Sequence, residues 1–137
     1  MQKLFKTITL SVLFVAFLVP QAADARYKGD VAGWLPWWSA SEGIKDVEEN
    51  MDDIDILYPF VYEVDADGGL LAKADLESND WDDMLDEARD ENVEIIPTVM
   101  WFDGDQIHAV LSDKKKRRAH IDEIVDMVDD GRFDGVN

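Results

Sequence analysis

The chain has 137 residues, and its 13 Lys and Arg against 31 Asp and Glu give a formal net charge of −18 at pH 7. This acidity excludes a nucleic-acid-binding protein, because contacts to phosphates need clustered cations. The chain contains no Cys, which excludes both a disulfide framework and a lipid anchor attached through Cys. The stability of the fold must therefore come from a packed apolar core.

The first 25 residues have the three parts of a secretory signal peptide. Lys3 and Lys6 form a basic start, an apolar run follows at residues 8–19, and Ala23-Asp24-Ala25 supplies the small residues of a cleavage site. The apolar run has about 12 residues, whereas a helix that spans a membrane needs roughly 20. We therefore expect a signal peptide at residues 1–25 and a secreted mature protein with no membrane segment.

The mature sequence alternates strand-like and helix-like segments. Apolar, β-branched and aromatic runs predict four strands, at residues 30–35, 54–64, 93–100 and 133–137. Apolar residues at helical spacing predict helices between them, at residues 41–50, 80–92, 106–111 and from 113 to a stop at Gly131. Asp65-Ala66-Asp67-Gly68-Gly69 has the composition of a hairpin turn. The order β-α-β-α-β-α-β predicts an α/β fold with parallel strands and right-handed crossovers.

Two of these helices have a marked apolar face, and the first strand is apolar enough to predict that it is buried. In the helix at 80–92 the apolar residues follow the pattern i, i+3, i+4, i+7, which predicts that Trp81 belongs to the core. These residues are Trp81, Met84, Leu85 and Ala88. The helix that begins at 113 has a comparable face, formed by Ile121, Ile124, Val125 and Val128.

Two architectures share this element order, an open doubly wound sheet and a closed (β/α)₈ barrel, and spacing alone does not choose between them. A doubly wound sheet usually carries a glycine-rich phosphate loop after its first strand. Here that position holds Trp34-Leu35-Pro36-Trp37-Trp38. Flat aromatic rings are better suited to stacking on sugar rings than to holding a phosphate, so this feature favours the barrel.

Aromatic residues recur near the ends of several predicted strands. In a barrel all parallel strands point their carboxyl ends at one face, where the active site lies, so these residues would converge. For any single ring the alternative is a place in the core, because aromatic side chains are large core fillers. The candidate sugar-binding residues are Trp37, Trp38, Phe60, Tyr62 and Trp101, the last followed by Phe102.

The last five residues, Phe133-Asp134-Gly135-Val136-Asn137, resemble the start of the signature of glycoside hydrolase family 18. In that family the signature lies on the fourth barrel strand and ends in a Glu. Residues 31–38, 57–62 and 95–101 are similar in order and spacing to the family's first three strands. The resemblance covers essentially all of residues 26–137. It implies the N-terminal part of a (β/α)₈ TIM barrel, with about three and a half βα units.

This resemblance implies a secreted glycosidase that hydrolyses β-linked N-acetylglucosamine polymers, either peptidoglycan or chitin, by substrate-assisted retention. It implies no metal and no cofactor. Asp134 would have a supporting role at the start of the acidic row, and Asn137 would occupy its second position. The general acid, a Glu, would lie four residues beyond Asn137. We therefore expect residues 26–137 to be a truncated catalytic barrel that is inactive and poorly soluble by itself.

Two departures from the family pattern point to its peptidoglycan-associated and uncharacterised branches. The third strand reads Pro97-Thr98-Val99-Met100, where chitinases of the family usually have Ser-x-Gly-Gly. The second position of the signature is Asn137 instead of Asp. Two other functions stay open: a non-catalytic, lectin-like glycan-binding protein on the same barrel, and an independent small α/β binding domain that ends at residue 137.

Three further motifs carry weaker signals. Residues 63–68 faintly resemble a calcium loop, but the twelfth position is Ala74, where a bidentate Glu is required. The basic run 114–118 is best interpreted as a solvated helix face in an acidic, exported protein. His108 and His120 have no paired ligand spacing, so surface or helix-packing roles are expected.

Overall fold

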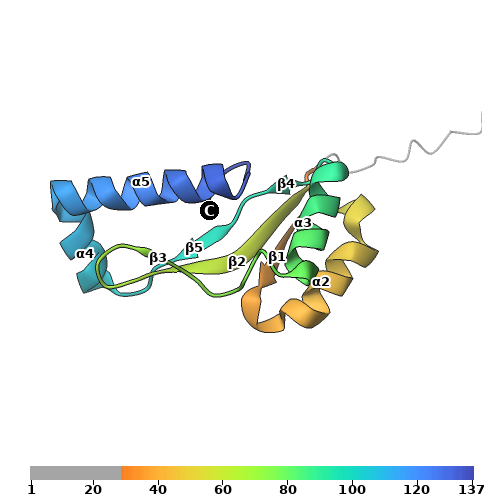
Figure 1. Ribbon diagram of the computed structural model, residues 1–137, viewed down its shortest axis with the longest axis horizontal. Coiled ribbons are helices and arrows are strands. Elements are labelled where there is room, and N and C mark those ends of the chain that lie inside the picture. The colour runs from red at the N-terminus through yellow and green to blue at the C-terminus, as the bar shows by residue number, and fades with distance from the viewer. Residues whose placement is uncertain (1–28) are drawn as a thin grey trace, which may run out of the picture.

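The computed structural model describes residues 29–137, so the predicted signal peptide lies outside the described residues. A sheet of parallel strands forms its centre, with one antiparallel strand added by a hairpin (Figure 1). The strands are β1 (Ala32–Pro36), β2 (Ile56–Val64), β3 (Leu70–Ala72), β4 (Glu94–Ile95) and β5 (Thr98–Met100). β1 and the pair β4 and β5 all run parallel to β2, whereas β3 returns antiparallel to it, which confirms the predicted turn.

The third predicted strand is confirmed in position but divided in two. β4 ends at Ile95 and β5 begins at Thr98, with Pro97 between them. Proline has no backbone N–H to donate to a neighbouring strand, so it interrupts the regular ladder. The register between β2 and β5 also shifts by one residue between Phe60 and Tyr62.

The fourth predicted strand, residues 133–137, is not formed as a regular strand, but the backbone of residues 134–137 pairs with the segment that contains β4 and β5. The N–H of Asp134 donates to the carbonyl of Ile95, and the N–H of Asn137 donates to that of Pro97, both at 2.9 Å. The N–H of Val99 returns a 2.9 Å bond to the carbonyl of Asn137. This alternating pattern is that of parallel pairing.

The spatial order of the strands therefore follows their order in the chain: β1, β2, the pair β4 and β5, then residues 134–137. A doubly wound sheet reverses direction beside its first strand, whereas a (β/α)₈ barrel adds each strand next to the one before it. The described residues form the barrel type of arrangement, as an open sheet of parallel β/α units, which confirms the predicted fold class.

Two helices cover one face of the sheet, α2 (Ala40–Glu49) and α3 (Asn79–Asp90) (Figure 1). The predicted apolar face of α3 is confirmed, because all four of its apolar residues are buried. Short 3₁₀ turns, Trp37–Ser39 and Met51–Asp53, flank α2. The buried cluster between sheet and helices consists of Leu35, Ile44, Val47, Met51, Leu57, Val61, Trp81, Met84, Leu85, Ala88, Val93 and Ile95.

The prediction of a buried first strand is wrong for most of that strand. Leu35 is 2% exposed, but Val31 and Trp34 are 51% and 65% exposed. Side chains alternate between the two faces of a strand, and the helices cover only the face that Leu35 occupies. The opposite face of β1 is open in the described part of the chain.

The remaining helices are α4 (Gly104–Ser112) and α5 (Lys114–Asp130). Asp103 and Asp113 cap their N-termini, each accepting two backbone N–H bonds. The apolar face predicted for α5 is only half covered: Ile121 and Val125 are exposed, and the buried residue of the helix is His120. Among residues 29–137, none of the helices combines the length and the apolarity needed to cross a bilayer.

Hydrogen bonds fasten α5 to the turn between β2 and β3. His120 Nδ1 lies 2.6 Å from the carbonyl oxygen of Gly68, and the N–H of Leu70 donates to Glu123 Oε1 at 2.8 Å. Gly68 has a φ of 93°, and a Cβ at this position would lie 2.9 Å from a methyl group of Val110. His120 thus has the helix-packing role that its sequence context predicted.

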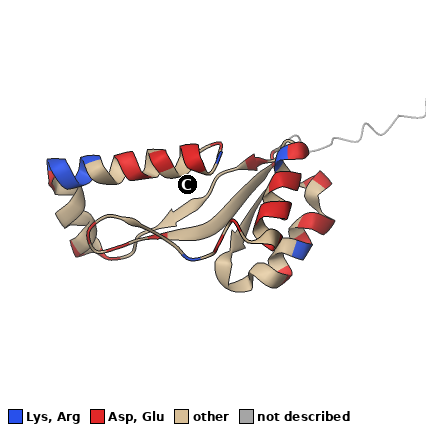
Figure 2. Cartoon of the chain, in the orientation of Figure 1, with Lys and Arg blue, Asp and Glu red and all other residues tan. Residues whose placement is uncertain are grey.

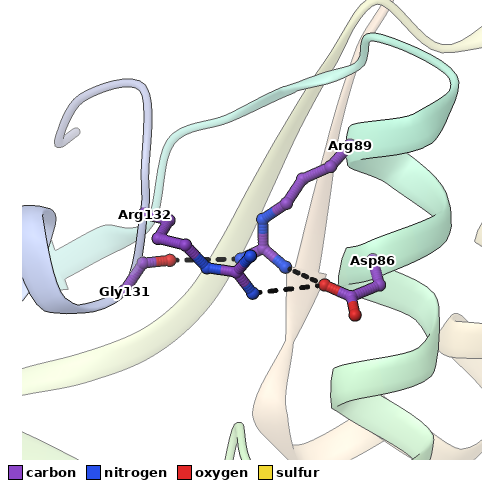
Figure 3. A network of polar contacts seen from close by, with 4 residues as sticks. All are labelled: Asp86, Arg89, Gly131 and Arg132. Atoms are coloured by element: carbon purple, nitrogen blue, oxygen red, sulfur yellow. Dashed lines mark hydrogen bonds and ion pairs between the residues drawn. The ribbon is translucent and has the colours of Figure 1, made fainter.

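A second polar network joins α3 to the end of α5 (Figure 3). Arg89 donates to Asp86 Oδ1 at 2.7 Å and to the carbonyl of Gly131 at 3.1 Å. Arg132 donates to the same Asp86 oxygen at 3.3 Å. These bonds hold the turn after α5 beside α3, so that the segment beginning at Asp134 enters the sheet next to β4.

Charge is distributed unevenly over these elements (Figure 2). Asp and Glu residues lie along α2, α3 and most of α5, whereas Lys and Arg residues cluster at the start of α5. The basic run 114–118 is exposed apart from the partly buried Arg117, and Arg118 pairs with Asp122 at 3.0 Å. The interpretation of this run as a solvated helix face is therefore confirmed.

Candidate functional site

Four aromatic side chains meet at the carboxyl end of β1 and the middle of β2. Trp34 and Phe60 are stacked, with ring centroids 5.7 Å apart and planes inclined by 10°. Trp38 meets Phe60 edge to face at 5.5 Å, and Trp37 meets Trp38 edge to face at 5.7 Å. We call this continuous group of Trp34, Trp37, Trp38 and Phe60 the aromatic platform.

Strand register and local backbone geometry assemble the platform. Parallel pairing sets Pro36 of β1 opposite Phe60 of β2, so the residues that follow Pro36 begin at the level of the Phe60 ring. The chain then turns at once into the 3₁₀ helix Trp37–Ser39, which folds Trp37 and Trp38 back toward β2. Leu35 points into the core, and alternation therefore turns Trp34 to the opposite face, beside Phe60.

The platform is open to solvent. Trp34 is 65% exposed and Trp38 is 61% exposed, while Trp37 is 37% exposed. Trp34 and Phe60 lie on the face of the sheet opposite to the helices. The faces of exposed indole and phenyl rings are apolar and flat, and they match the C–H faces of pyranose rings.

The structure brings three of the five predicted sugar-binding residues together, namely Trp37, Trp38 and Phe60. Sequence reasoning missed Trp34, because the first strand was interpreted as buried throughout. The signal that identifies it is alternation: once Leu35 is assigned to the core, its neighbour must face the other way.

Tyr62 has a different environment from the platform. In a regular strand it would share a face with Phe60, but the register shift between the two residues breaks the alternation. Tyr62 instead packs against the buried core and lines a pocket of about 370 Å³ together with Leu85 and Phe133. Burial raises the pKa of the Tyr62 hydroxyl above its ordinary value of 10.0.

Trp101 also has its own neighbours. Its ring lies 5.0 Å from the ring of His120, and its Nε1 is buried without a hydrogen-bond partner among the described residues. The adjacent Phe102 is 81% exposed. A role for Tyr62 or Trp101 in sugar binding stays a prediction.

Comparison with known proteins identifies the fold. No protein-family model matches the chain, and no curated protein matches it in sequence. Solved structures do match: the GH18 chitinase ChiB of Flavobacterium johnsoniae has 19% identity and a TM-score of 0.62, covering 80% of this chain and 35% of its own. The fold is that of part of a glycoside hydrolase family 18 barrel.

Two further matches are a spore cortex-lytic enzyme and a second chitinase. The spore cortex-lytic enzyme SleL of Bacillus cereus has 13% identity and a TM-score of 0.63, covering 78% of this chain and 26% of its own. A Group II chitinase domain of Ostrinia furnacalis, solved with an N-acetylglucosamine oligomer, has 14% identity and a TM-score of 0.62, covering 78% and 30%. This chain thus spans only about a quarter to a third of the solved structures that it matches.

Within the family 18 fold, the two predicted signature residues lie at different levels of the sheet. Asp134 Oδ2 accepts the N–H of Ile95 at 2.8 Å, which fastens the fourth strand to β4 three residues before the platform level. Asn137 Nδ2 donates to Thr98 Oγ1 at 3.3 Å, and Thr98 is paired with Phe60. Asn137 is therefore level with the platform. The side chain of Asp134 instead binds the backbone of Ile95 and so links the fourth segment to β4. The catalytic roles of both residues stay predictions.

An ion pair lies at the edge of the platform. Lys73 Nζ is 5.5 Å from the centroid of the Trp37 ring and 2.8 Å from Glu63 Oε2. A backbone bond of 2.7 Å from Lys73 to the carbonyl of Val61 holds the end of the hairpin against β2. Within residues 29–137, no group of three or more His, Asp or Glu side chains is arranged to hold a metal ion.

Proposed function

We propose that this chain is part of a secreted glycoside hydrolase that cleaves β-linked N-acetylglucosamine polymers, either peptidoglycan or chitin. The observation that carries the proposal is the exposed aromatic platform at the carboxyl end of β1, beside Phe60 in the middle of β2, in a fold shared with family 18 chitinases and a spore cortex-lytic enzyme. Carboxyl ends of the strands are where barrel enzymes place their active sites.

The proposed reaction is substrate-assisted and retaining. A Glu four residues beyond Asn137 protonates the glycosidic oxygen as general acid. The carbonyl oxygen of the sugar's own 2-acetamido group then attacks the anomeric carbon, so the bond to the leaving sugar breaks as the new C–O bond forms. Water, deprotonated by the same Glu, opens the cyclic ion and regenerates the acid.

The residues of this chain would hold the glycan while that reaction occurs. Trp38 and Phe60 would stack on sugar rings, and Trp34 would extend the same surface along β1. Asn137, level with Phe60, would face the region where charge develops, with an amide in place of a carboxylate. Asp134 would support the row by fixing the fourth strand to β4.

The test uses the protein expressed from its complete gene. Purified protein should release chromophore from a chromogenic N-acetylglucosamine oligomer or solubilise labelled peptidoglycan, and changing the predicted Glu to Gln should abolish that activity. Residues 26–137 expressed alone should be inactive and poorly soluble, because an unclosed barrel leaves strand edges exposed. Robust hydrolysis by residues 26–137 alone would contradict the proposed mechanism.

The alternative is a lectin-like glycan-binding protein on the same scaffold, which needs the platform but not the acid. The residue four places past Asn137 in the complete gene decides between the two functions. A Glu supports the hydrolase, and Gln, Leu or Ala supports the binding protein. A cooperative unfolding transition of a monomeric chain ending at residue 137 would instead favour an independent small domain.

A further inference from the structure

The ion pair at the platform edge is built by two strands of the hairpin. Glu63 belongs to β2 and Lys73 follows β3, and the backbone bond from Lys73 to Val61 sets where the Lys73 side chain leaves the hairpin. The side chains of Lys73 and Glu63 are 32% and 41% exposed, so both are accessible to a ligand lying on the platform. Lys73 lies beside Trp37 and Glu63 contacts its ammonium group, so the pair borders the surface on which a sugar would bind.

The two charges at the edge of the platform, those of Lys73 and Glu63, neutralise each other in the absence of a ligand. Trp34, Trp37, Trp38 and Phe60 are uncharged. Among residues 29–137, Lys73 is the only cation in cation–π contact with a ring, and Glu63 already pairs with its ammonium group at 2.8 Å. A ligand carboxylate would have to displace Glu63 from Lys73, which would leave two carboxylates beside one cation.

The charge of the whole chain acts in the same direction. A net charge of −18 produces a negative potential that disfavours the approach of anions. Peptidoglycan strands carry a lactyl group on every second sugar, and its carboxylate is free where no stem peptide is attached, whereas chitin-type strands carry no lactyl group. Peptidoglycan and chitin, the two substrates considered under the proposed function, therefore differ in sugar carboxylates, the groups with which Lys73 and Glu63 would interact.

We propose that Glu63 determines the charge specificity of the platform. Because Glu63 already pairs with the ammonium group of Lys73, a sugar carboxylate must compete with it for that group. Uncharged N-acetylglucosamine units therefore bind in preference to units that bear a lactyl carboxylate. This inference rests on the proposed function, because it concerns the choice between its two substrates. It assigns Glu63 a selective role distinct from that of the stacking rings.

Isothermal titration calorimetry on the protein from its complete gene tests the proposal with two oligosaccharides of equal length. One is an N-acetylglucosamine oligomer, and the other is a peptide-free glycan alternating N-acetylglucosamine with N-acetylmuramic acid. The wild-type protein should bind the uncharged oligomer more tightly. Glu63→Gln should tighten binding of the carboxylated glycan by about two- to fivefold relative to the uncharged oligomer, the range for a half-exposed ion pair.

Two further variants complete the experiment. Lys73→Gln removes the cation and leaves Glu63, so it should weaken binding of the carboxylated glycan relative to the uncharged oligomer. Glu87→Gln removes an exposed carboxylate from α3 and should alter neither affinity, which controls for the change in net charge. If Glu63→Gln does not fold, as judged by its thermal transition, Lys73→Gln alone still distinguishes the two glycans.

A wild-type preference for the carboxylated glycan would overturn the proposal. Equal effects of Glu63→Gln or Lys73→Gln on both glycans would also overturn it, since that result indicates an ion pair with a structural role only. If the wild-type protein binds neither oligosaccharide, the proposed function itself fails and the specificity proposal fails with it, so the two failures are distinguishable.

Discussion

Trp34 and Phe60 stack almost face to face, with their ring planes inclined by only 10°, although they come from different strands. The contact exists because β1 and β2 are parallel neighbours whose register sets Pro36 opposite Phe60. Trp38 joins the same pair from the 3₁₀ turn that follows β1. The site proposed to bind sugar is therefore a consequence of strand pairing between segments that are far apart in the chain.

Removing one platform ring should weaken glycan binding without unfolding the protein. Trp38 is 61% exposed, so Trp38→Ala removes little buried area, and we expect the affinity for an N-acetylglucosamine oligomer to fall about tenfold, as for a central aromatic contact. Calorimetric titration measures this change. Val125→Ala on α5, a half-exposed apolar position away from the platform, is the matched control and should leave affinity unchanged. Equal affinities of Trp38→Ala and the wild type would argue against the platform.

The turn between β2 and β3 should tolerate no side chain at Gly68. Gly68→Ala imposes a left-handed φ of 93° on a residue with a Cβ and pushes that Cβ to 2.9 Å from Val110. The conformational strain alone should lower the free energy of unfolding by about 1–2 kcal/mol, measured by chemical denaturation.

Gly104→Ala is the control for this substitution. Gly104 begins α4, and an added Cβ there has no neighbour within 4 Å, so the variant should be neutral or slightly stabilising. Faster hydrogen exchange of the Leu70 amide in Gly68→Ala alone would place the damage at the contact between the turn and α5. Equal stability of the two variants would contradict the assignment.

The core beneath α3 should be sensitive to loss of volume. Met84 is fully buried in the cluster between α3 and the sheet. Met84→Ala should lower the free energy of unfolding by about 2–5 kcal/mol, because it removes buried methylene groups and leaves a cavity. The neighbouring Asp83 is exposed, and Asp83→Ala should change stability by less than about 0.5 kcal/mol. Thermal or urea denaturation of both variants checks the contrast, and similar losses in both would show that this core assignment is wrong.

The turn after β2 should carry an acid-sensitive contact at Asp65. Backbone N–H groups of Gly69 and Asp67 donate to its carboxylate, and these bonds lower the pKa of Asp65 below its ordinary value of 3.8. A carboxyl whose pKa is lower in the folded state stabilises the fold at pH values above its unfolded pKa. That contribution is lost as the pH falls through the folded pKa.

Nuclear magnetic resonance titration of the Asp65 carboxyl carbon measures this pKa directly. In Asp65→Asn the corresponding part of the acid dependence of stability should disappear. Asp67→Asn keeps the backbone donor to Asp65 and should preserve it. A pKa for Asp65 at or above 3.8 would contradict the hydrogen-bonded geometry of the turn.

Local sequence patterns were sufficient to predict most element types and much of their placement. Local periodicity is sufficient to predict α3 and its buried face, because its apolar residues recur at helical spacing and so form one apolar stripe. These residues are Trp81, Met84, Leu85 and Ala88. The Asp-Gly turn and the strands on either side of it were likewise readable from neighbouring residues. Trp37 and Trp38 were identifiable as candidates because they follow the carboxyl end of the first predicted strand, whereas Phe60 lies in the middle of β2.

Which of these residues meet depends on pairing between distant segments of the chain. The barrel type of strand order depends on the pairing of residues 134–137 with β4 and β5. Long-range hydrogen bonds fix this pairing, and no local sequence pattern encodes it. Trp34 joined the platform because the helices cover a single face of β1. Tyr62 is not part of the platform because a one-residue register shift reverses the alternation of side chains along β2. Side-chain direction in a sheet depends on pairing register and on which face is covered, and both are properties of partners distant in sequence.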